Sequence, residues 1–152
     1  MAGEHSTKRK VLFVCIGNMC RSQMAEGFAR AYGKDLIDVY SAGTSATGVV
    51  SLEVIKVMEE RGIDISEHIS KGLDEVPVEE MDVVVSMARR SASEICPPDF
   101  KGEKIDWVVR DPIGGPMDAY RIVRDDIEEK VRALLKSIWK GRAASSGRLW
   151  LS

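Results

Sequence analysis

Cys15 and Arg21 are the residues whose types and spacing most directly suggest chemistry. An apolar run ends at Cys15, a short loop containing Gly17 follows, and a helical pattern begins near Ser22. A loop between a strand and a helix N-terminus directs several backbone N–H groups at one point, with the helix dipole behind them, and therefore binds anions. These groups favour a thiolate at Cys15, which would lie beneath a phosphate-like anion, placed for in-line attack. Arg21 could donate a fork of hydrogen bonds to that anion.

The positions after Cys15 form the predicted substrate-binding loop, which consists of Ile16, Gly17, Asn18, Met19, Cys20 and Ser22. A Cys-x5-Arg pair also occurs by chance, and a cysteine at the end of a strand is usually a small core residue. The strand–loop–helix junction and the glycine inside the loop favour the functional interpretation. The sequence therefore predicts a nucleophilic cysteine in an anion-binding loop.

Asp111 is the candidate general acid and base. It precedes Pro112 and follows the fourth apolar run of the chain, and the loop-forming residues 113–116 come next. In a parallel sheet, ligands bind beyond the carboxyl ends of the strands, so we expect Asp111 on the same sheet edge as Cys15. There it could protonate a leaving group and later deprotonate the attacking water. The alternative is that the Asp-Pro pair only shapes a turn.

Helical and extended patterns alternate along the chain. The apolar runs expected as strands are Val11–Cys15, Leu36–Ser41, Met81–Met87 and Ile105–Val109. The segments with helical spacing are Ser22–Tyr32, Leu52–Arg61 and Asp118–Trp139. This alternation predicts an α/β fold in which a parallel sheet carries helices on both faces.

The composition is that of one globular domain. We expect a polar N-terminal tail over residues 1–9, a single catalytic domain over residues 10–140, and a flexible tail over residues 141–152, which is rich in Gly, Ser and Ala. A net charge of −2 provides no general reason to bind nucleic acid or an anionic membrane. No apolar run near the N-terminus is long enough for a signal peptide or a membrane span.

The cysteines and histidines point to free thiols rather than to a metal site. Three cysteines and two histidines, without a Cys-x-x-Cys pair, are too few and too scattered for a four-ligand zinc site. An odd cysteine count without a signal peptide indicates a reducing compartment, so we expect a cytoplasmic protein.

The segment Val11–Glu26 resembles the phosphate-binding loop of the low-molecular-weight protein tyrosine phosphatase superfamily, which includes thioredoxin-linked arsenate reductases. The resemblance extends over about Lys10–Ser137 and includes the segments Ser41–Gly43, Ile65–His68 and Asp111-Pro112. It implies a four-stranded parallel sheet flanked by helices, with neither a metal nor an organic cofactor.

The same resemblance implies roles for individual residues. Cys15 would be the nucleophile that forms a phosphocysteine intermediate, Arg21 the transition-state clamp and Asp111 the general acid and base. Asn18 and Ser41 would brace the loop, and Ser22 would hydrogen-bond the thiolate. His68 is either a further bracing residue or a structural histidine. Cys20 could trap an oxidised Cys15 as a disulfide, or it is a packed thiol.

Two activities on this scaffold remain open. Phosphomonoester hydrolysis is the main expectation, because the segments Asp111–Gly115 and Asp118–Tyr120 resemble bacterial phosphatases. Arsenate reduction is the alternative, because Ser22–Gly27 is closer to the reductase branch. A thioredoxin-linked reductase needs two relay cysteines after the third strand. The first would fall near Ala88, and Cys96 lies about one residue out of register with the second.

Resolution of a reductase intermediate would therefore depend on Cys20, on Cys96 or on an external thiol, with thioredoxin or glutaredoxin as candidate partners. The substrate would be a phosphorylated protein, a small phosphomonoester or arsenate. Ile113 and Gly114 stand where tyrosine-selective members usually carry aromatic residues, and Met19 stands where arginine phosphatases carry a small threonine. A non-catalytic oxyanion-binding module is disfavoured because Cys15, Arg21 and Asp111 are all present.

Overall fold

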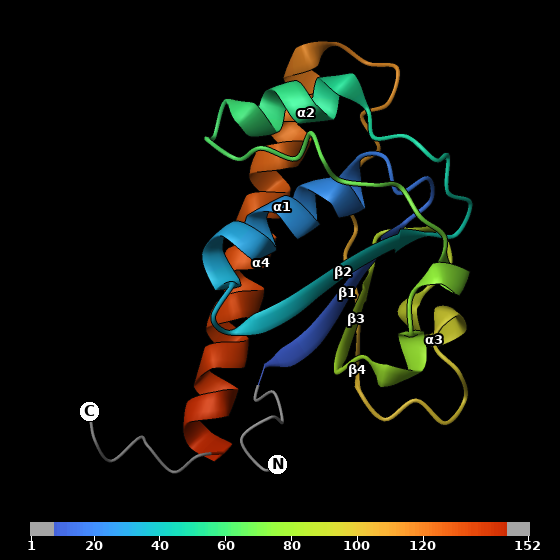
Figure 1. The fold of residues 1–152 in the computed structure, drawn as a ribbon, viewed down its shortest axis with the longest axis vertical. Helices are drawn as coiled ribbons and strands as arrows, with labels where there is room; N and C mark the ends of the chain where they lie inside the picture. The colour runs from blue at the N-terminus through green and yellow to red at the C-terminus, as the bar shows by residue number, and fades with distance from the viewer. Residues whose placement is uncertain (1–7, 146–152) are drawn as a thin grey trace.

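A computed structural model describes residues 8–145 of the chain (Figure 1). Its strands are β1 (Arg9–Cys15), β2 (Ile37–Gly43), β3 (Val83–Ser86) and β4 (Glu103–Asp106). Its α-helices are α1 (Arg21–Gly33), α2 (Leu52–Glu59), α3 (Ala92–Ile95) and α4 (Met117–Ser145), and two 3₁₀ turns, η2 (Leu73–Glu75) and η3 (Val78–Glu80), precede β3.

The strands form one parallel sheet in the order β2-β1-β3-β4. Cys15 at the end of β1 pairs with Gly43 at the end of β2, and Val14 pairs with Ser86 at the end of β3. Because the strands are parallel and in step, the segments that follow them emerge at one edge of the sheet. The predicted four-stranded parallel α/β fold is confirmed.

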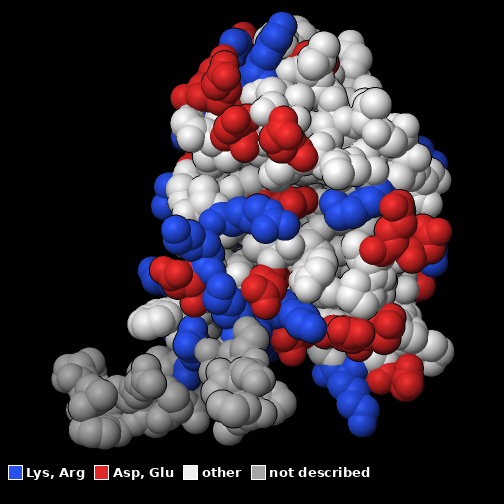
Figure 2. Space-filling view, viewed as in Figure 1, with Lys and Arg blue, Asp and Glu red and all other residues white. Residues whose placement is uncertain are grey.

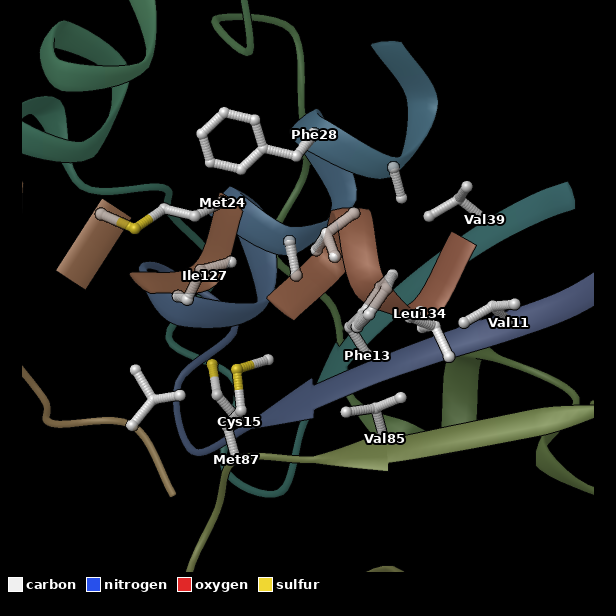
Figure 3. Close-up of a cluster of buried hydrophobic side chains, with 14 of the residues drawn as sticks. Val11, Phe13, Cys15, Met24, Phe28, Val39, Val85, Met87, Ile127 and Leu134 are labelled. Carbon is white, nitrogen blue, oxygen red and sulfur yellow. The ribbon is translucent and has the colours of Figure 1, made fainter. Parts of the chain in front are cut away.

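Helices cover both faces of the sheet, but unequally. Alternate residues of β1 point to opposite faces, as the period of a strand requires. Val11, Phe13 and Cys15 belong to a core cluster with residues of α1 and α4 (Figure 3), whereas Leu12 and Val14 pack on the other face near α3. The helix α2 lies over α1 and α4 rather than on the sheet (Figure 1). The cysteine therefore ends a strand that is buried on both faces.

Ion pairs join the turn that follows α2 to α4. Glu60 accepts hydrogen bonds from Arg121 and Arg124, and Arg61 donates to Asp125 and Glu128. Most of these side chains are at least partly exposed, so solvent screens the pairs and each adds little stability. No helix within residues 8–145 is both long and apolar enough to cross a membrane.

Several element boundaries differ from the predictions. The fourth strand is Glu103–Asp106 rather than Ile105–Val109, because it is an edge strand that tolerates charged residues. The short helix α3 was not predicted, although Ser91 and Glu94 form a capping box at its start. The predicted flexible tail from residue 141 was wrong over its first part, because α4 continues to Ser145. The predicted N-terminal tail overlaps β1 at Arg9, and residues 1–7 and 146–152 lie outside the described part.

Charged side chains of both signs are scattered over the face seen in Figure 2. They gather over α2 and across the lower half, whereas the area over the loop that follows β2 is largely uncharged (Figure 2). Val49 in that loop and Ile69 nearby in the chain that follows α2 are exposed.

Candidate active site

The loop after β1 has the hydrogen bonding of an anion cradle. Its carbonyl groups accept from the segment after β2: Thr44 donates to Cys15, Ser45 to Ile16, Thr47 to Gly17 and Ser51 to Met19, at 2.8–3.0 Å. In contrast, none of the backbone N–H groups of residues 16–20 donates to another residue within the described part of the chain. Asn18 and Cys20 are buried, and a buried N–H group without an acceptor is costly. The loop is therefore built to receive a ligand that accepts hydrogen bonds.

Asn18 fixes the shape of this loop. Its backbone has φ 49°, the left-handed conformation that asparagine tolerates better than most residues. Its side-chain Nδ2 donates to Ser22 Oγ at 2.8 Å and to Ser41 Oγ at 3.0 Å. Its Oδ1 accepts from the backbone N–H of Lys71 at 2.8 Å. The loop is thus tied to α1, to β2 and to the segment before η2 by one side chain.

The hydroxyl of Ser22 contacts the candidate nucleophile. Cys15 Sγ lies 2.9 Å from Ser22 Oγ, and the cysteine is only 2% exposed. Because Ser22 Oγ accepts from Asn18, its own proton is available to the sulfur. The structure therefore brings the Ser22 hydroxyl into contact with the Cys15 sulfur, as the family resemblance implied.

A buried carboxylate stands behind Ser41. Ser41 Oγ donates to Glu26 Oε1 at 2.5 Å, and Glu26 Oε2 also accepts from Arg30 at 2.8 Å. Burial opposes ionisation of Glu26, but the hydrogen bond from Ser41 and the neighbouring His68 and Arg30 outweigh it, so its pKa lies below the ordinary value. Glu26 thereby holds the Ser41 hydroxyl in the orientation that accepts from Asn18.

His68 reaches the loop through Gln23. Its Nδ1 lies 2.9 Å from Gln23 Oε1, and Gln23 Nε2 donates to the backbone oxygen and to Oδ1 of Asn18. Because Gln23 presents an oxygen, His68 Nδ1 carries the proton in this contact. Burial lowers the pKa of His68, although Glu26 opposes the shift. His68 therefore belongs to the network that braces the loop, and Gln23 and Glu26 are the members that sequence reasoning missed.

Arg21, the first residue of α1, is anchored by the segments that follow two other strands. Its Nη1 donates to the backbone oxygens of Met87 at 2.8 Å and Val109 at 3.1 Å, which follow β3 and β4. Neither Nε nor Nη2 donates a hydrogen bond to a residue that the structure describes. The guanidinium is thus buried and fixed through one nitrogen while its other donors stay available for an oxyanion.

Asp111 lies beside Arg21, as its predicted position on the sheet edge requires. Asp111 Oδ2 is 3.8 Å from Arg21 Nη2, and the aspartate side chain is half exposed. Its other oxygen, Oδ1, accepts from the backbone N–H of Ile113 at 3.1 Å. The carboxylate therefore both shapes the turn and borders the anion-binding loop, so the two predicted roles are compatible.

The three cysteines occupy different environments, and all are free thiols. Cys20 is buried, and burial together with the charges of Cys15 and Asp111 raises its pKa, which keeps it a protonated thiol. Cys96 packs with Leu12 and Val14 on the face of the sheet opposite the Cys15 side chain. The structure does not bring Cys96 to the site. Within residues 8–145, no group of His, Cys, Asp and Glu could hold a metal ion.

A cleft of about 400 Å³ opens next to Arg21 and Asp111. Its lining comes from the loop after β1 and from the segments that follow β3 and β4, and includes Ile16, Met87, Ala88, Arg89, Trp107 and Val108. Sequence reasoning placed Trp107 and Val108 inside a strand and therefore missed this cleft.

Comparison with known proteins identifies the family. Residues 10–144 match the family described as low molecular weight phosphotyrosine protein phosphatase. The chain is 39% identical over 132 residues to the glutaredoxin arsenate reductase of Synechocystis sp.. The matched region covers 86% of this chain and 98% of that protein.

Two solved structures show the same architecture. An arsenate reductase in the phosphate-binding state superposes with a TM-score of 0.75 at 38% identity, over 86% of this chain and 98% of its own. A tyrosine phosphatase from Erwinia amylovora has a TM-score of 0.74 at 22% identity, over 88% of this chain and 95% of its own, and shares the fold. This chain belongs to the low-molecular-weight phosphotyrosine protein phosphatase family and is similar to arsenate reductases within it.

Proposed function

We propose that this protein reduces arsenate, with Cys15 as the nucleophile and an external thiol as the reductant. The observation that carries the proposal is the row of unpaired N–H groups beside the Cys15 thiol and the Arg21 guanidinium, in a chain that is 38–40% identical to proteins named arsenate reductases. Arsenate is a tetrahedral oxyanion that accepts hydrogen bonds from such a cradle. These relatives favour the activity that sequence analysis held as the alternative.

The proposed reaction takes place in three steps. The Cys15 thiolate attacks arsenic, and Asp111 donates a proton to the departing oxygen, which leaves as water. The sulfur of an external thiol then bonds to Cys15 Sγ, and the arsenic–sulfur bond breaks with its electron pair on arsenic, which departs as arsenite. A second thiol reduces the mixed disulfide and regenerates Cys15. Arsenic gains two electrons, and two external thiols become one disulfide.

The need for an external thiol follows from where the other cysteines lie. Cys96 packs on the opposite face of the sheet, and Ala88 beside the cleft carries no sulfur. Burial keeps Cys20 protonated, and a protonated thiol is a poor nucleophile. A small thiol or glutaredoxin is therefore the proposed partner rather than thioredoxin. Such reductants are supplied in the cytoplasm, the compartment that we propose for this protein.

A coupled assay tests the proposal. Arsenate-dependent NADPH oxidation is measured with glutathione, glutathione reductase and glutaredoxin in one arm, and with thioredoxin and thioredoxin reductase in the other. We expect turnover in the first arm and little in the second. Cys96→Ser should retain full turnover, and Cys20→Ser should retain more than about a tenth of it, because neither thiol resolves the intermediate. Turnover that requires Cys96, or a reaction supported by thioredoxin alone, contradicts the proposed electron path.

Phosphomonoester hydrolysis is the second candidate, and the position of Asp111 favours it. A carboxyl group 3.8 Å from Arg21, at the border of the loop, could protonate an alcohol or phenol leaving group. Water would then release phosphate from Cys15. Hydrolysis of p-nitrophenyl phosphate, measured beside arsenate reduction with the same preparation, compares the two activities. Its substrate would be a phosphorylated protein or a small phosphomonoester.

A further inference from the structure

The cleft beside Arg21 extends beyond the groups that would hold arsenate. We call the part lined by Ile16, Arg21 and Asp111 its inner end, because these residues belong to the Cys15 loop or border it. Its outer end is formed by Arg89, Ser91, Asp106, Trp107 and Val108, from the segments that follow β3 and β4. A tetrahedral oxyanion fills only the inner end, so the outer end is available to a second molecule.

The outer end carries charged groups of both signs that have hydrogen-bonding capacity left for a ligand. Arg89 is exposed, and it makes no hydrogen bond or ion pair with any residue in the described part of the chain. Asp106 Oδ1 accepts from the backbone N–H of Ala92, whereas Oδ2 has no such partner among the described residues. One cation and one anion therefore face the same space.

The outer end also has an apolar wall. Trp107 is half buried and packs against Phe13, with 5.8 Å between the ring centroids, so its ring is held in place. Val108, the next residue, is 95% exposed and also lines the cleft. An aliphatic segment between charged ends would cover this wall.

Met87, whose backbone oxygen accepts from Arg21, and Ala88, which precedes Arg89, line the passage between the two ends. The methyl side chain of Ala88 leaves this passage open toward Arg21. The Met87 side chain lies beside that of Cys15, and both belong to one core cluster (Figure 3). The cleft therefore runs past Met87, a neighbour of Cys15 in the core, to Arg21 at the border of the Cys15 loop.

Building on the proposed arsenate reduction, we propose that the outer cleft binds the thiol co-substrate, a small zwitterionic thiol peptide of the glutathione class. A carboxylate of the peptide pairs with Arg89, its ammonium group pairs with Asp106, and its backbone lies on Trp107 and Val108. The thiol in the middle of such a peptide then points past Ala88 toward Cys15. A volume of about 400 Å³ suits a ligand of this size and not a folded protein.

Binding is measured first, because it does not depend on turnover. S-Methylglutathione, whose sulfur cannot react, is titrated calorimetrically into the full-length protein, with inorganic phosphate present to occupy the Cys15 loop. Arg89→Glu should weaken binding about tenfold or more, because a charged hydrogen bond is replaced by repulsion. Arg90→Glu is the matched control: it makes the same charge change one residue away, but Arg90 donates to the carbonyl of Glu94 and does not line the cleft. Its effect should stay below about twofold.

Kinetics provide the second readout. Arg89→Glu should raise the KM for glutathione about tenfold while leaving the KM for arsenate unchanged. With 2-mercaptoethanol, which carries no charge to pair, the variant and the native protein should react alike.

The outcomes separate this inference from the proposed function. Equal weakening by Arg89→Glu and Arg90→Glu would mean general electrostatics and would overturn the cleft assignment, as would failure of S-methylglutathione to bind. Glutathione-driven turnover that ignores Arg89 would also overturn it while leaving the proposed function intact. Binding that depends on Arg89, without arsenate turnover with any thiol, would support the cleft and refute the proposed function.

Discussion

At the scale of single residues, the direction of hydrogen bonds decides what Cys15 can do. Asn18 Nδ2 is a hydrogen-bond donor only, so the oxygens of Ser22 and Ser41 must accept from it. The Ser22 proton is then directed to Cys15, and the Ser41 proton to Glu26. The Cys15 thiol thus has the Ser22 hydroxyl as a hydrogen-bond donor, because the donors and acceptors of the contacts behind it can be assigned in only one way.

Cys15→Ser tests the nucleophile. We expect arsenate reduction and any phosphatase activity to fall by several powers of ten, because a serine hydroxyl at this position is a much weaker nucleophile than a thiolate. Phosphate should still bind, since the N–H groups and Arg21 remain, and a calorimetric titration measures this. Cys96→Ser serves as the cysteine control. A variant that retains more than about a tenth of native activity would remove Cys15 from the mechanism.

Asp111→Asn tests the general acid through leaving groups. A p-nitrophenolate ion departs readily without a proton, whereas the unsubstituted phenolate does not, so hydrolysis of phenyl phosphate should slow about tenfold more than that of p-nitrophenyl phosphate. Steady-state kinetics with both substrates measure the difference. Asparagine keeps the size and turn preference of aspartate. Equal, small losses with both substrates would leave Asp111 a role in the turn alone.

At the scale of elements, the loop after β1 depends on the end of β2. Thr44, Ser45 and Thr47 hold the loop carbonyls, which is possible because Gly43 lets the two backbones approach closely. A Cβ at position 43 would lie 2.5 Å from the Ile16 oxygen and 2.8 Å from the Asn18 nitrogen. Both atoms belong to the backbone and cannot move without displacing the loop.

Gly43→Ala should therefore cost activity as well as stability. We expect a loss of about 1–3 kcal/mol in the free energy of unfolding, as for other overpacked sites. A displaced cradle should also weaken phosphate binding and turnover by more than about tenfold. Urea unfolding and phosphate titration measure the two effects. Gly141→Ala, where a Cβ meets nothing within 4 Å, is the control: it should leave phosphate binding unchanged and should not lower stability, because alanine favours a helix more than glycine does. Native phosphate affinity in Gly43→Ala would refute the argument.

At the scale of the whole molecule, the bracing network makes the fold sensitive to acid. The pKa of His68 is lowered in the folded protein, so folding favours the neutral ring, and this stabilisation is lost as the pH falls below the unfolded value of about 6.5. The pKa of Glu26 is also lowered, so its contribution persists to lower pH and is lost only as the pH falls through its folded pKa. Both groups act in the same direction.

His68→Gln tests this linkage. The native protein should lose stability between pH 7 and pH 5, in the range around the unfolded histidine pKa of about 6.5, and the variant should lose less, because glutamine does not titrate. Urea unfolding at several pH values measures the slope. The chain's other histidine, His5, is present in both proteins and cancels in the comparison. Identical slopes would show that His68 does not couple protonation to folding.

The loop after β1 was predictable because its signals are local. Cys15, Gly17, Arg21 and Ser22 lie within one strand–loop–helix unit, where spacing along the chain sets spacing in space. The alternation of apolar runs with helical patterns likewise predicted the parallel sheet. The position of Asp111 could be predicted from the sheet, because the loops that follow parallel strands lie at one edge.

Only the tertiary structure decided which distant groups complete the site. Met87 and Val109 anchor Arg21 through backbone oxygens, which every residue has and no sequence pattern marks. The apolar run Ile105–Val109 has the pattern of a strand, but β4 is the charged edge strand Glu103–Asp106. The rest of the run, residues 107–109, follows the strand and lines the cleft. Cys96 lies close to Ala88 in the chain, yet the packing of α3 places it across the sheet from Cys15. Spacing along the chain determines local geometry, whereas the burial and partners of remote segments depend on how the layers pack.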